Sequence, residues 1–180
     1  MYGNVINNKQ ILELCQAGCI NISPFDRNKL QTVHYPLKIK LIREYDSDNE
    51  LTKIVELKHG GCYTLKANDY VVIEINERIV LKPGIIGEFV NSSNLIEKGL
   101  FLTCGKLDPC YGTNGEAIRF GLKNLRSSPV TIESDLKLAY IKFYDLRALD
   151  NLSYFLSAEE QKLWRKRIQR AVDDGVQYED

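Results

Sequence analysis

Short apolar segments, each closed by a turn signal, fill the middle of the chain. In the clearest of them Ile118, Phe120 and Leu122 alternate with polar residues, so they share one face. Arg119 and Lys123 lie on the other face, which is the pattern of a strand that buries one side. The predicted strands are 35–45, 51–57, 62–66, 70–76, 79–81, 85–90, 117–123, 130–133 and 138–144. Many short strands with few helices predict a mainly β fold, a barrel or a sandwich.

A helical pattern stands near the start of the chain, at residues 7–18. Asn7 or Asn8 can cap its first turn, because a short polar side chain accepts from the free backbone amides there. Gly18 can end it, since glycine adopts the left-handed conformation that closes many helices. We therefore expect one short helix before the β region.

A second helical segment, 157–172, begins with a capping box formed by Ser157 and Glu160. Its apolar stripe is formed by Trp164, Ile168, Ala171 and Val172. Its basic side chains have a solvated face as their simplest role, with contact to nucleic acid or an acidic partner as the alternative. We expect a β domain over residues 1–150, followed over 151–180 by a helical extension with an acidic tail.

Composition narrows the class of protein. The chain has 180 residues, which suits one domain. Lys and Arg number 24, as do Asp and Glu, so the net charge is zero and we do not expect nucleic acid as the main partner. No apolar stretch approaches the ~20 residues that span a bilayer, so we expect no membrane partner. The start carries no secretory leader, and five cysteines suggest reduced thiols, so we expect a cytoplasmic protein. No cysteine or histidine cluster completes a metal site.

Five segments, taken in order, resemble the dUTPase and trimeric dCTP deaminase superfamily, in its deaminase branch. They are 20–26 (Ile-Asn-Ile-Ser-Pro-Phe-Asp), 35–39 (Tyr-Pro-Leu-Lys-Ile), 91–94 (Asn-Ser-Ser-Asn), 105–112 (Gly-Lys-Leu-Asp-Pro-Cys-Tyr-Gly) and 120–124 (Phe-Gly-Leu-Lys-Asn). The resemblance implies a distorted β-barrel or jelly-roll subunit. It also implies a homotrimer with nucleotide sites at the subunit interfaces.

The resemblance also assigns roles to four residues. Ser92 and Ser93 match the serine pair that contacts phosphates, a role that hydroxyl donors fit. Asp108 matches the aspartate that orients the attacking water and touches the sugar, so it is the candidate catalytic residue. Tyr111 matches the tyrosine that packs on the deoxyribose. Ser92, Ser93, Asp108 and Tyr111 are therefore the predicted nucleotide-binding residues, with dUTP or dCTP as the ligand.

The chain departs from the superfamily where charge and proton transfer are needed. The arginines that flank the serine pair are replaced by Asn91 and Ile96. The deaminase glutamate that acts as general acid and base is replaced by Gly121, which cannot move a proton. The aspartate that dUTPases use near Mg²⁺ corresponds to Pro36. We therefore expect deamination to be lost, no metal held by the protein, and Mg²⁺ to enter only with a nucleoside triphosphate.

Each assigned role has a structural alternative. Ser92 and Ser93 also suit the N-cap of a short helix. Asp108 also suits a turn whose backbone its side chain would hold. Tyr111 also suits packing between subunits.

Three functions remain open. The first is a nucleotide-binding or scaffold homologue with weakened or lost catalysis. The second is an active dUTP or dCTP pyrophosphatase or deaminase that uses Asp108 and rearranged residues, so that whether the protein is an enzyme stays undecided. The third is a protein-interaction module that acts through the C-terminal helix. Cations that could replace the missing arginines in the second function are Lys98, Arg119, Lys123 and Arg126.

Overall fold

The computed structural model describes residues 4–109, 111–112 and 116–146, together with Glu159, Lys162 and Lys166, which are helical. The strands are β1 (Asn4–Val5), β2 (Ile20–Ser23), β3 (Tyr35–Leu37), β4 (Ile39–Tyr45), β5 (Leu51–Glu56), β6 (Cys62–Leu65), β7 (Tyr70–Ile75), β8 (Arg78–Leu81), β9 (Ile85–Asn91), β10 (Leu100–Thr103), β11 (Lys106–Leu107), β12 (Arg119–Asn124), β13 (Val130–Glu133) and β14 (Ala139–Asp145). The helices are α1 (Asn8–Gln16), α2 (Ser93–Glu97) and the 3-10 turn η1 (Arg27–Lys29). The rest of the predicted helix 157–172, the acidic tail and Cys110 lie outside the described residues.

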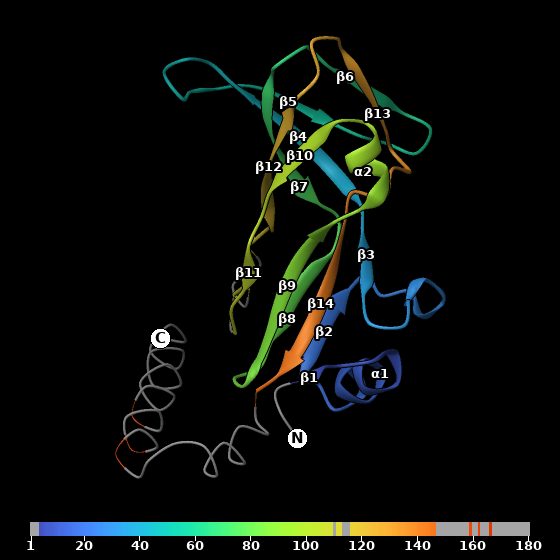
Figure 1. The fold of residues 1–180 in the computed structure, drawn as a ribbon, viewed down its shortest axis with the longest axis vertical. Helices are drawn as coiled ribbons and strands as arrows, with labels where there is room; N and C mark the ends of the chain where they lie inside the picture. The colour runs from blue at the N-terminus through green and yellow to red at the C-terminus, as the bar shows by residue number, and fades with distance from the viewer. Residues whose placement is uncertain are drawn as a thin grey trace.

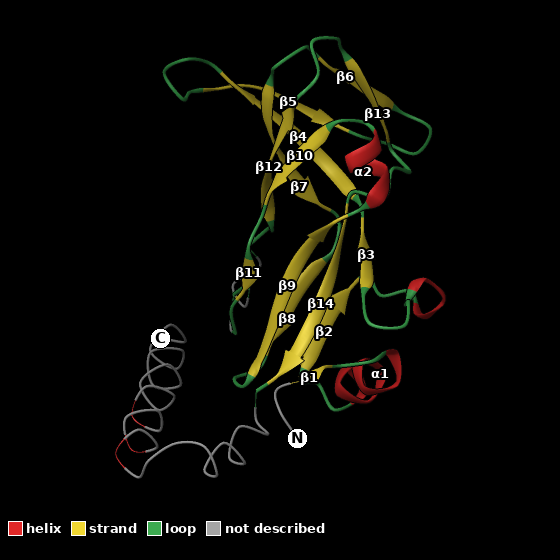
Figure 2. Cartoon of the chain, in the orientation of Figure 1, coloured by secondary structure: helices red, strands yellow, loops and turns green. Residues whose placement is uncertain are grey.

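Two five-stranded sheets carry the fold. One has the order β1-β14-β9-β11, with β3 also paired to β14, and the other has the order β10-β12-β7-β4-β5. Two smaller pairs, β13-β6 and β2-β8, complete it, and Figures 1 and 2 show the first sheet in the lower half of the view and the second above it. The mainly β, jelly-roll-like fold predicted from the sequence is confirmed, with open sheets rather than a closed barrel among the described residues.

The core lies where the inner faces of these strands meet. In β14 the side chains of Ala139, Ile141 and Phe143 are fully buried and alternate with partly exposed neighbours, as a strand with one buried face requires. Between the two sheets, the rings of Phe89 on β9 and Phe120 on β12 pack edge to face with their centroids 4.7 Å apart. This ring pair joins the sheets beside the candidate site.

Helix α1 forms as the sequence predicts, within two residues at each end. Asn7 and Gln10 make a capping box, in which each side chain accepts from the backbone N–H of the other, at 3.0 and 2.9 Å. Ile11 packs fully buried, so the apolar side of the helix is anchored in the core. Among the described residues, no helix has the length and apolar character needed to cross a membrane.

The single strand predicted over 35–45 is wrong in one respect, because it is divided into β3 and β4. The division falls at Lys38, whose backbone N–H donates to Oε2 of Glu77 at 3.0 Å instead of to a neighbouring strand. The chain thereby passes from the sheet of β14 to the sheet of β7. Glu77 is only 4% exposed, so a distant buried side chain sets this break.

Candidate functional site

The candidate site lies where two paired strands separate. β10 and β12 run antiparallel up to the pair Thr103 and Gly121. Beyond that pair the first chain segment crosses over as β11 to pair with β9, while β12 extends along β7 toward Arg119. The two segments therefore belong to different sheets, and the space between them is left open.

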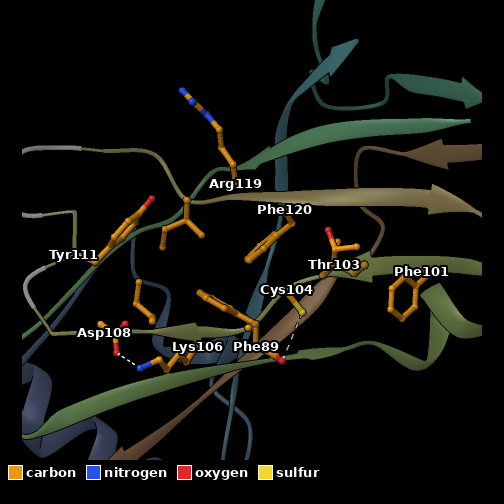
Figure 3. A pocket seen from close by; sticks show the side chains of 13 residues that line it. Phe89, Phe101, Thr103, Cys104, Lys106, Asp108, Tyr111, Arg119 and Phe120 are labelled. Carbon is orange, nitrogen blue, oxygen red and sulfur yellow. Dashed lines mark hydrogen bonds and ion pairs between the residues drawn. The ribbon is translucent and has the colours of Figure 1, made fainter. Parts of the chain in front are cut away.

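A pocket of about 660 Å³ fills this space. It is lined by Phe89, Phe101, Leu102, Thr103, Cys104, Gly105, Lys106, Leu107, Asp108, Tyr111, Ile118, Arg119 and Phe120. Figure 3 shows Tyr111 on one side of the opening and Phe101 on the other, with Phe89 and Phe120 between them. The pocket thus combines aromatic rings with polar and charged groups, which together can contact a small ligand.

Two of the four predicted site residues line this pocket together. Tyr111 is 45% exposed, and its backbone N–H donates to the carbonyl of Asp108 at 3.4 Å. The carboxylate of Asp108 pairs with the ammonium of Lys106 at 2.8 Å (Figure 3). Both side chains of this pair are more than half exposed, and such surface pairs contribute only ~0–1 kcal/mol. A ligand group can therefore displace Lys106 from Asp108 at little cost.

The serine pair lies outside the pocket lining. Ser92 is fully buried at the N-cap of α2, where its Oγ accepts from the N–H of Leu95 at 3.2 Å and donates to the carbonyl of Lys137. Its hydrogen-bonding capacity is therefore used within the subunit. Ser93, the first residue of α2, is exposed. Within one chain the structure brings Asp108 and Tyr111 together, and places Ser92 and Ser93 elsewhere.

The position of the deaminase glutamate, Gly121, lies on the outer face of the sheet. A Cβ atom at Gly121 would overlap the hydroxyl oxygen of Tyr70 and Oγ1 of Thr103. Thr103 also donates from Oγ1 to the carbonyl of Gly121 at 3.3 Å. Two neutral hydroxyl-bearing side chains therefore occupy the space into which a side chain at this position would extend.

Asn124, which also matches the superfamily, has a structural role here. It is fully buried, and its Nδ2 donates to the carbonyls of Leu65, Lys66 and Ser128 at 3.2, 2.9 and 2.9 Å. Its Oδ1 accepts from the N–H of Arg126 at 2.9 Å. These bonds fix the turn after β12.

Arg119 belongs to a charge cluster on the outer face. Figure 3 shows its side chain pointing away from Phe120, because neighbours along a strand face opposite ways. Its Nε donates to Oε2 of Glu74 at 3.3 Å, and a terminal nitrogen of Arg43 donates to the same oxygen at 3.0 Å. Burial alone raises the pKa of Glu74, but the hydrogen bonds and charges of Arg43 and Arg119 bring that pKa below its ordinary value. Glu74 therefore stays ionised and holds Arg119 to the sheet.

Cys104 is the thiol in the pocket lining. Burial raises its pKa, and the negative charge of Glu88 raises it further. Its Sγ donates to the carbonyl of Phe89 at 3.7 Å (Figure 3). Because the thiolate is the nucleophilic form, this protonated thiol is part of the wall and not a reacting group.

The described residues do not fit a protein-bound metal. Within them no three His, Cys, Asp or Glu side chains gather closely enough to hold an ion. Pro36, at the position of the Mg²⁺-associated aspartate, lies in β3 and offers no side-chain ligand.

Sequence reasoning missed the walls of the pocket. Phe101 is 47% exposed although it is an aromatic residue on a strand, and Thr103 and Cys104 stand two and three residues after it. The signal was present in the short run Leu-Phe-Leu-Thr, where alternation turns Phe101 outward while Leu100 and Leu102 are buried.

Comparisons with known proteins agree with this geometry. The family model described as dCTP deaminase-like matches residues 5–146. The "dCTP deaminase, dUMP-forming" of Corynebacterium kroppenstedtii is 24% identical over 154 residues, which cover 78% of this chain and 81% of that protein. The protein of the same name from Dictyoglomus thermophilum is 22% identical over 171 residues, covering 86% and 87%.

A solved structure supports the fold. The 2'-deoxycytidine 5'-triphosphate deaminase of Agrobacterium tumefaciens superposes with a TM-score of 0.64 at 14% identity. The match covers 81% of this chain and 49% of that one, so this chain spans about half of that protein's length. The resemblance to the deaminase branch is confirmed, and the chain belongs to the dCTP deaminase-like family.

Proposed function

We propose that this protein is a deoxyribonucleotide-binding member of its family that has lost dCTP deamination. The observation that carries the proposal is Gly121, which stands where the superfamily has its proton-transferring glutamate and whose outer face is covered by Tyr70 and Thr103. Replacing an amino group on a base ring requires a group that moves protons, and such a group typically contributes ~10²–10⁴-fold in rate. Neither hydroxyl is a substitute for a carboxylate at neutral pH.

The pocket supports retained binding. Its volume and aromatic walls suit a small planar ligand, and Tyr111 is exposed enough to pack on a sugar. The relatives named dCTP deaminase make a pyrimidine deoxyribonucleotide the ligand class to test first. Mg²⁺ enters this proposal only as the companion of a triphosphate, since the described side chains offer it no site.

Assembly as a homotrimer is part of the same proposal. Tyr70 on β7, Phe101 on β10 and Leu125, directly after β12, are 52%, 47% and 63% exposed. A cluster of exposed large apolar side chains on one face is typical of an interaction surface. We also propose a cytoplasmic location, which agrees with described cysteines that are not joined in disulfides.

Three measurements on one nucleotide panel test the proposal. The purified protein is incubated with dCTP, dUTP, dCMP and dUMP, and its melting temperature, ammonia release and pyrophosphate release are recorded. We expect a rise in melting temperature with at least one ligand, reduced in Tyr111→Ala, and no ammonia from dCTP. Ammonia release that a pocket substitution abolishes would overturn the loss of deamination, and a panel without any melting shift would overturn binding.

A pyrophosphatase is the second candidate, because Asp108 lies in the pocket beside Tyr111, and among the described residues its carboxylate pairs with an exposed lysine alone. Under this function dUTP would release pyrophosphate. Asp108→Asn would then abolish the release while keeping the melting shift. Pyrophosphate release that Asp108→Asn leaves unchanged would remove Asp108 from the candidate catalytic residues.

A further inference from the structure

We infer that the pocket recognises only the base and the deoxyribose of its ligand, so that an uncharged pyrimidine 2'-deoxynucleoside binds about as tightly as the triphosphate. The inference rests on the proposed function, because it takes the pocket as the binding site. It goes further in naming which part of a nucleotide the chain can hold. The argument comes from Lys106 and from the four described cations that could replace the missing arginines, and from what already engages each of these five.

The positions that the resemblance assigns to phosphate carry no charge. Asn91 ends β9 with a neutral amide, and its Oδ1 is buried with no hydrogen-bond partner among the described residues. Ile96 in α2 is 65% exposed and apolar. The hydroxyl of Ser92 between them is already used by Leu95 and Lys137. In a homotrimer every copy presents these same residues, so a neighbouring subunit brings no cation at 91 or 96 either.

Cations close to α2 do not replace the missing charge. Lys98 pairs with Glu133 at 3.0 Å and also donates to the carbonyl of Thr131. A terminal nitrogen of Arg126 donates to the carbonyl of Glu97 at 2.6 Å, and its side chain packs over Gly99. These contacts hold both side chains against the subunit surface.

Two cations farther along the sheet are also engaged within the subunit. Lys123 donates to the carbonyl of Asn68. Arg119 is held by Glu74 at 3.3 Å and points away from the pocket interior. In the pocket itself Lys106 is neutralised by Asp108. The cations considered as replacements for the missing arginines are thus each engaged within the subunit.

Phosphate binding depends on such cations. A triphosphate brings several negative charges, and strong phosphate sites answer them with charge-assisted hydrogen bonds from arginine, lysine or preorganised backbone amides. Lys106 and Asp108 together add no net charge to the pocket, whether or not their side chains are in contact, so this pair does not attract a polyanion. The triphosphate would gain little here beyond what its nucleoside part gains.

The nucleoside part, by contrast, has matching groups. Phe89, Leu107 and Phe120 offer apolar contacts to a base, and Tyr111 offers a flat surface to the sugar. The carboxylate of Asp108 accepts hydrogen bonds, so a sugar hydroxyl can replace the exposed ammonium of Lys106 as its donor. An uncharged ligand with hydroxyl donors and a planar ring therefore complements the pocket.

Calorimetric titration with 2'-deoxyuridine, dUMP and dUTP tests the inference on the full chain. We expect dissociation constants within about threefold of one another. We also expect dUTP binding to change by less than about threefold between ~50 and ~500 mM NaCl, because phosphate contacts are what make binding salt-dependent. Binding of dUTP about 100-fold tighter than that of deoxyuridine, and weakened by salt, would overturn the inference and leave the proposed function standing. No binding of any of the three would overturn both.

A gain-of-charge variant supplies the matched control. In the homotrimer of the proposed function, whose nucleotide sites the resemblance places between subunits, Ile96→Arg restores a cation near the ligand. Ile96 is exposed, so the fold should tolerate the change. We expect it to tighten dUTP binding by about tenfold or more and to leave deoxyuridine binding unchanged. Tyr111→Ala should weaken all three ligands alike. An Ile96→Arg protein that binds dUTP no better than the parent would contradict the argument that the missing cations decide the ligand.

Discussion

The side chain of Tyr70 occupies the space that a side chain at position 121 would need. The strand pairing places Gly121 opposite Val72, with Tyr70 two residues farther along the same strand, and the tyrosine ring lies back over the glycine. An aromatic ring over a glycine on a neighbouring strand covers backbone that would otherwise be exposed. The packing of the sheet therefore disfavours a glutamate at position 121, in addition to the sequence having glycine there.

Substitution at Gly121 tests whether Tyr70 and Thr103 obstruct a side chain at this position. We expect Gly121→Ala to lower the free energy of unfolding by about 1–3 kcal/mol, because its methyl group overlaps the side chains of Tyr70 and Thr103. In a Tyr70→Ala background the same change should cost less, since half of the obstruction is gone. Urea unfolding of the parent, both single variants and the double variant measures the coupling. Equal costs in the two backgrounds would show that the ring does not occupy this space.

Glu77 and Glu74 make the folding stability depend on pH in opposite directions. Glu77 makes the stability fall as the pH rises, and Glu74 makes it increase. Glu77 is 4% exposed, and burial raises its pKa above the ordinary 4.5, although the N–H of Lys38 opposes the rise. A raised pKa contributes stability below 4.5 that is lost as the pH rises through the folded value. The lowered pKa of Glu74 contributes stability above 4.5 that is lost as the pH falls through its folded value.

The variant Glu77→Gln isolates the first effect. Its amide oxygen still accepts from Lys38, so the break between β3 and β4 keeps its hydrogen bond. We expect the parent to lose stability relative to this variant as the pH is raised from 4 toward 7, measured by urea unfolding at each pH. Glu74→Gln is the control, and the parent should gain relative to it over the same range. Parallel pH profiles for the parent and Glu77→Gln would contradict the raised pKa.

At the scale of elements, α2 is the segment for which the sequence and the structure suggest different roles. Its sequence, a serine pair after a strand, resembles a phosphate-binding turn. In the structure Ser92 closes the helix N-terminus and ties it to the carbonyl of Lys137 in the segment before β14. Ser93 makes no comparable contact and is exposed.

The two serines are therefore matched variants for one experiment. Ser92→Ala removes a helix cap and leaves the carbonyl of Lys137 without its donor, so we expect it to lower stability by about 1–3 kcal/mol. Ser93→Ala should change stability by less than about 0.5 kcal/mol. Chemical denaturation of both variants measures the difference. Equal effects from the two substitutions would contradict the N-cap assignment.

What the sequence predicts well is what depends on near neighbours. Alternation along 117–123 identified β12, and Asn7 with Gly18 bounded α1 closely, because burial and capping are local. The break at Lys38 was missed because Glu77, far along the chain, makes it. The motif named Asp108 and Tyr111, which line the pocket, and their roles stay predictions. The aromatic walls were not predicted, since only the fold brings Phe89 and Phe120 together.

For the whole molecule, the feature that bears on assembly is a group of exposed apolar side chains at one sheet. Exposed Tyr70, Phe101 and Leu125 lie on three connected segments of one sheet. Burying an apolar surface of this kind against a second copy of the chain lowers the free energy and so favours assembly. The homotrimer is the assembly that the proposed function needs.

Light scattering measures this assembly directly. We expect the mass of three chains at micromolar concentration, and a shift toward smaller species for Leu125→Asp, because a buried unpaired carboxylate destabilises an interface. Lys58→Glu, at a side chain that is 80% exposed, is the control and should keep the mass of the parent. A parent protein that stays a monomer at these concentrations would contradict the trimer.

The overlap at Gly121 also bears on how an acid could return to this position. A side chain at 121 leaves no room for the Tyr70 hydroxyl and Oγ1 of Thr103 as they lie here, so both side chains would have to move in a chain that carries glutamate there. Restoring the acid in this chain therefore takes a rearrangement of Tyr70, either by rotation of its exposed side chain or by a second substitution.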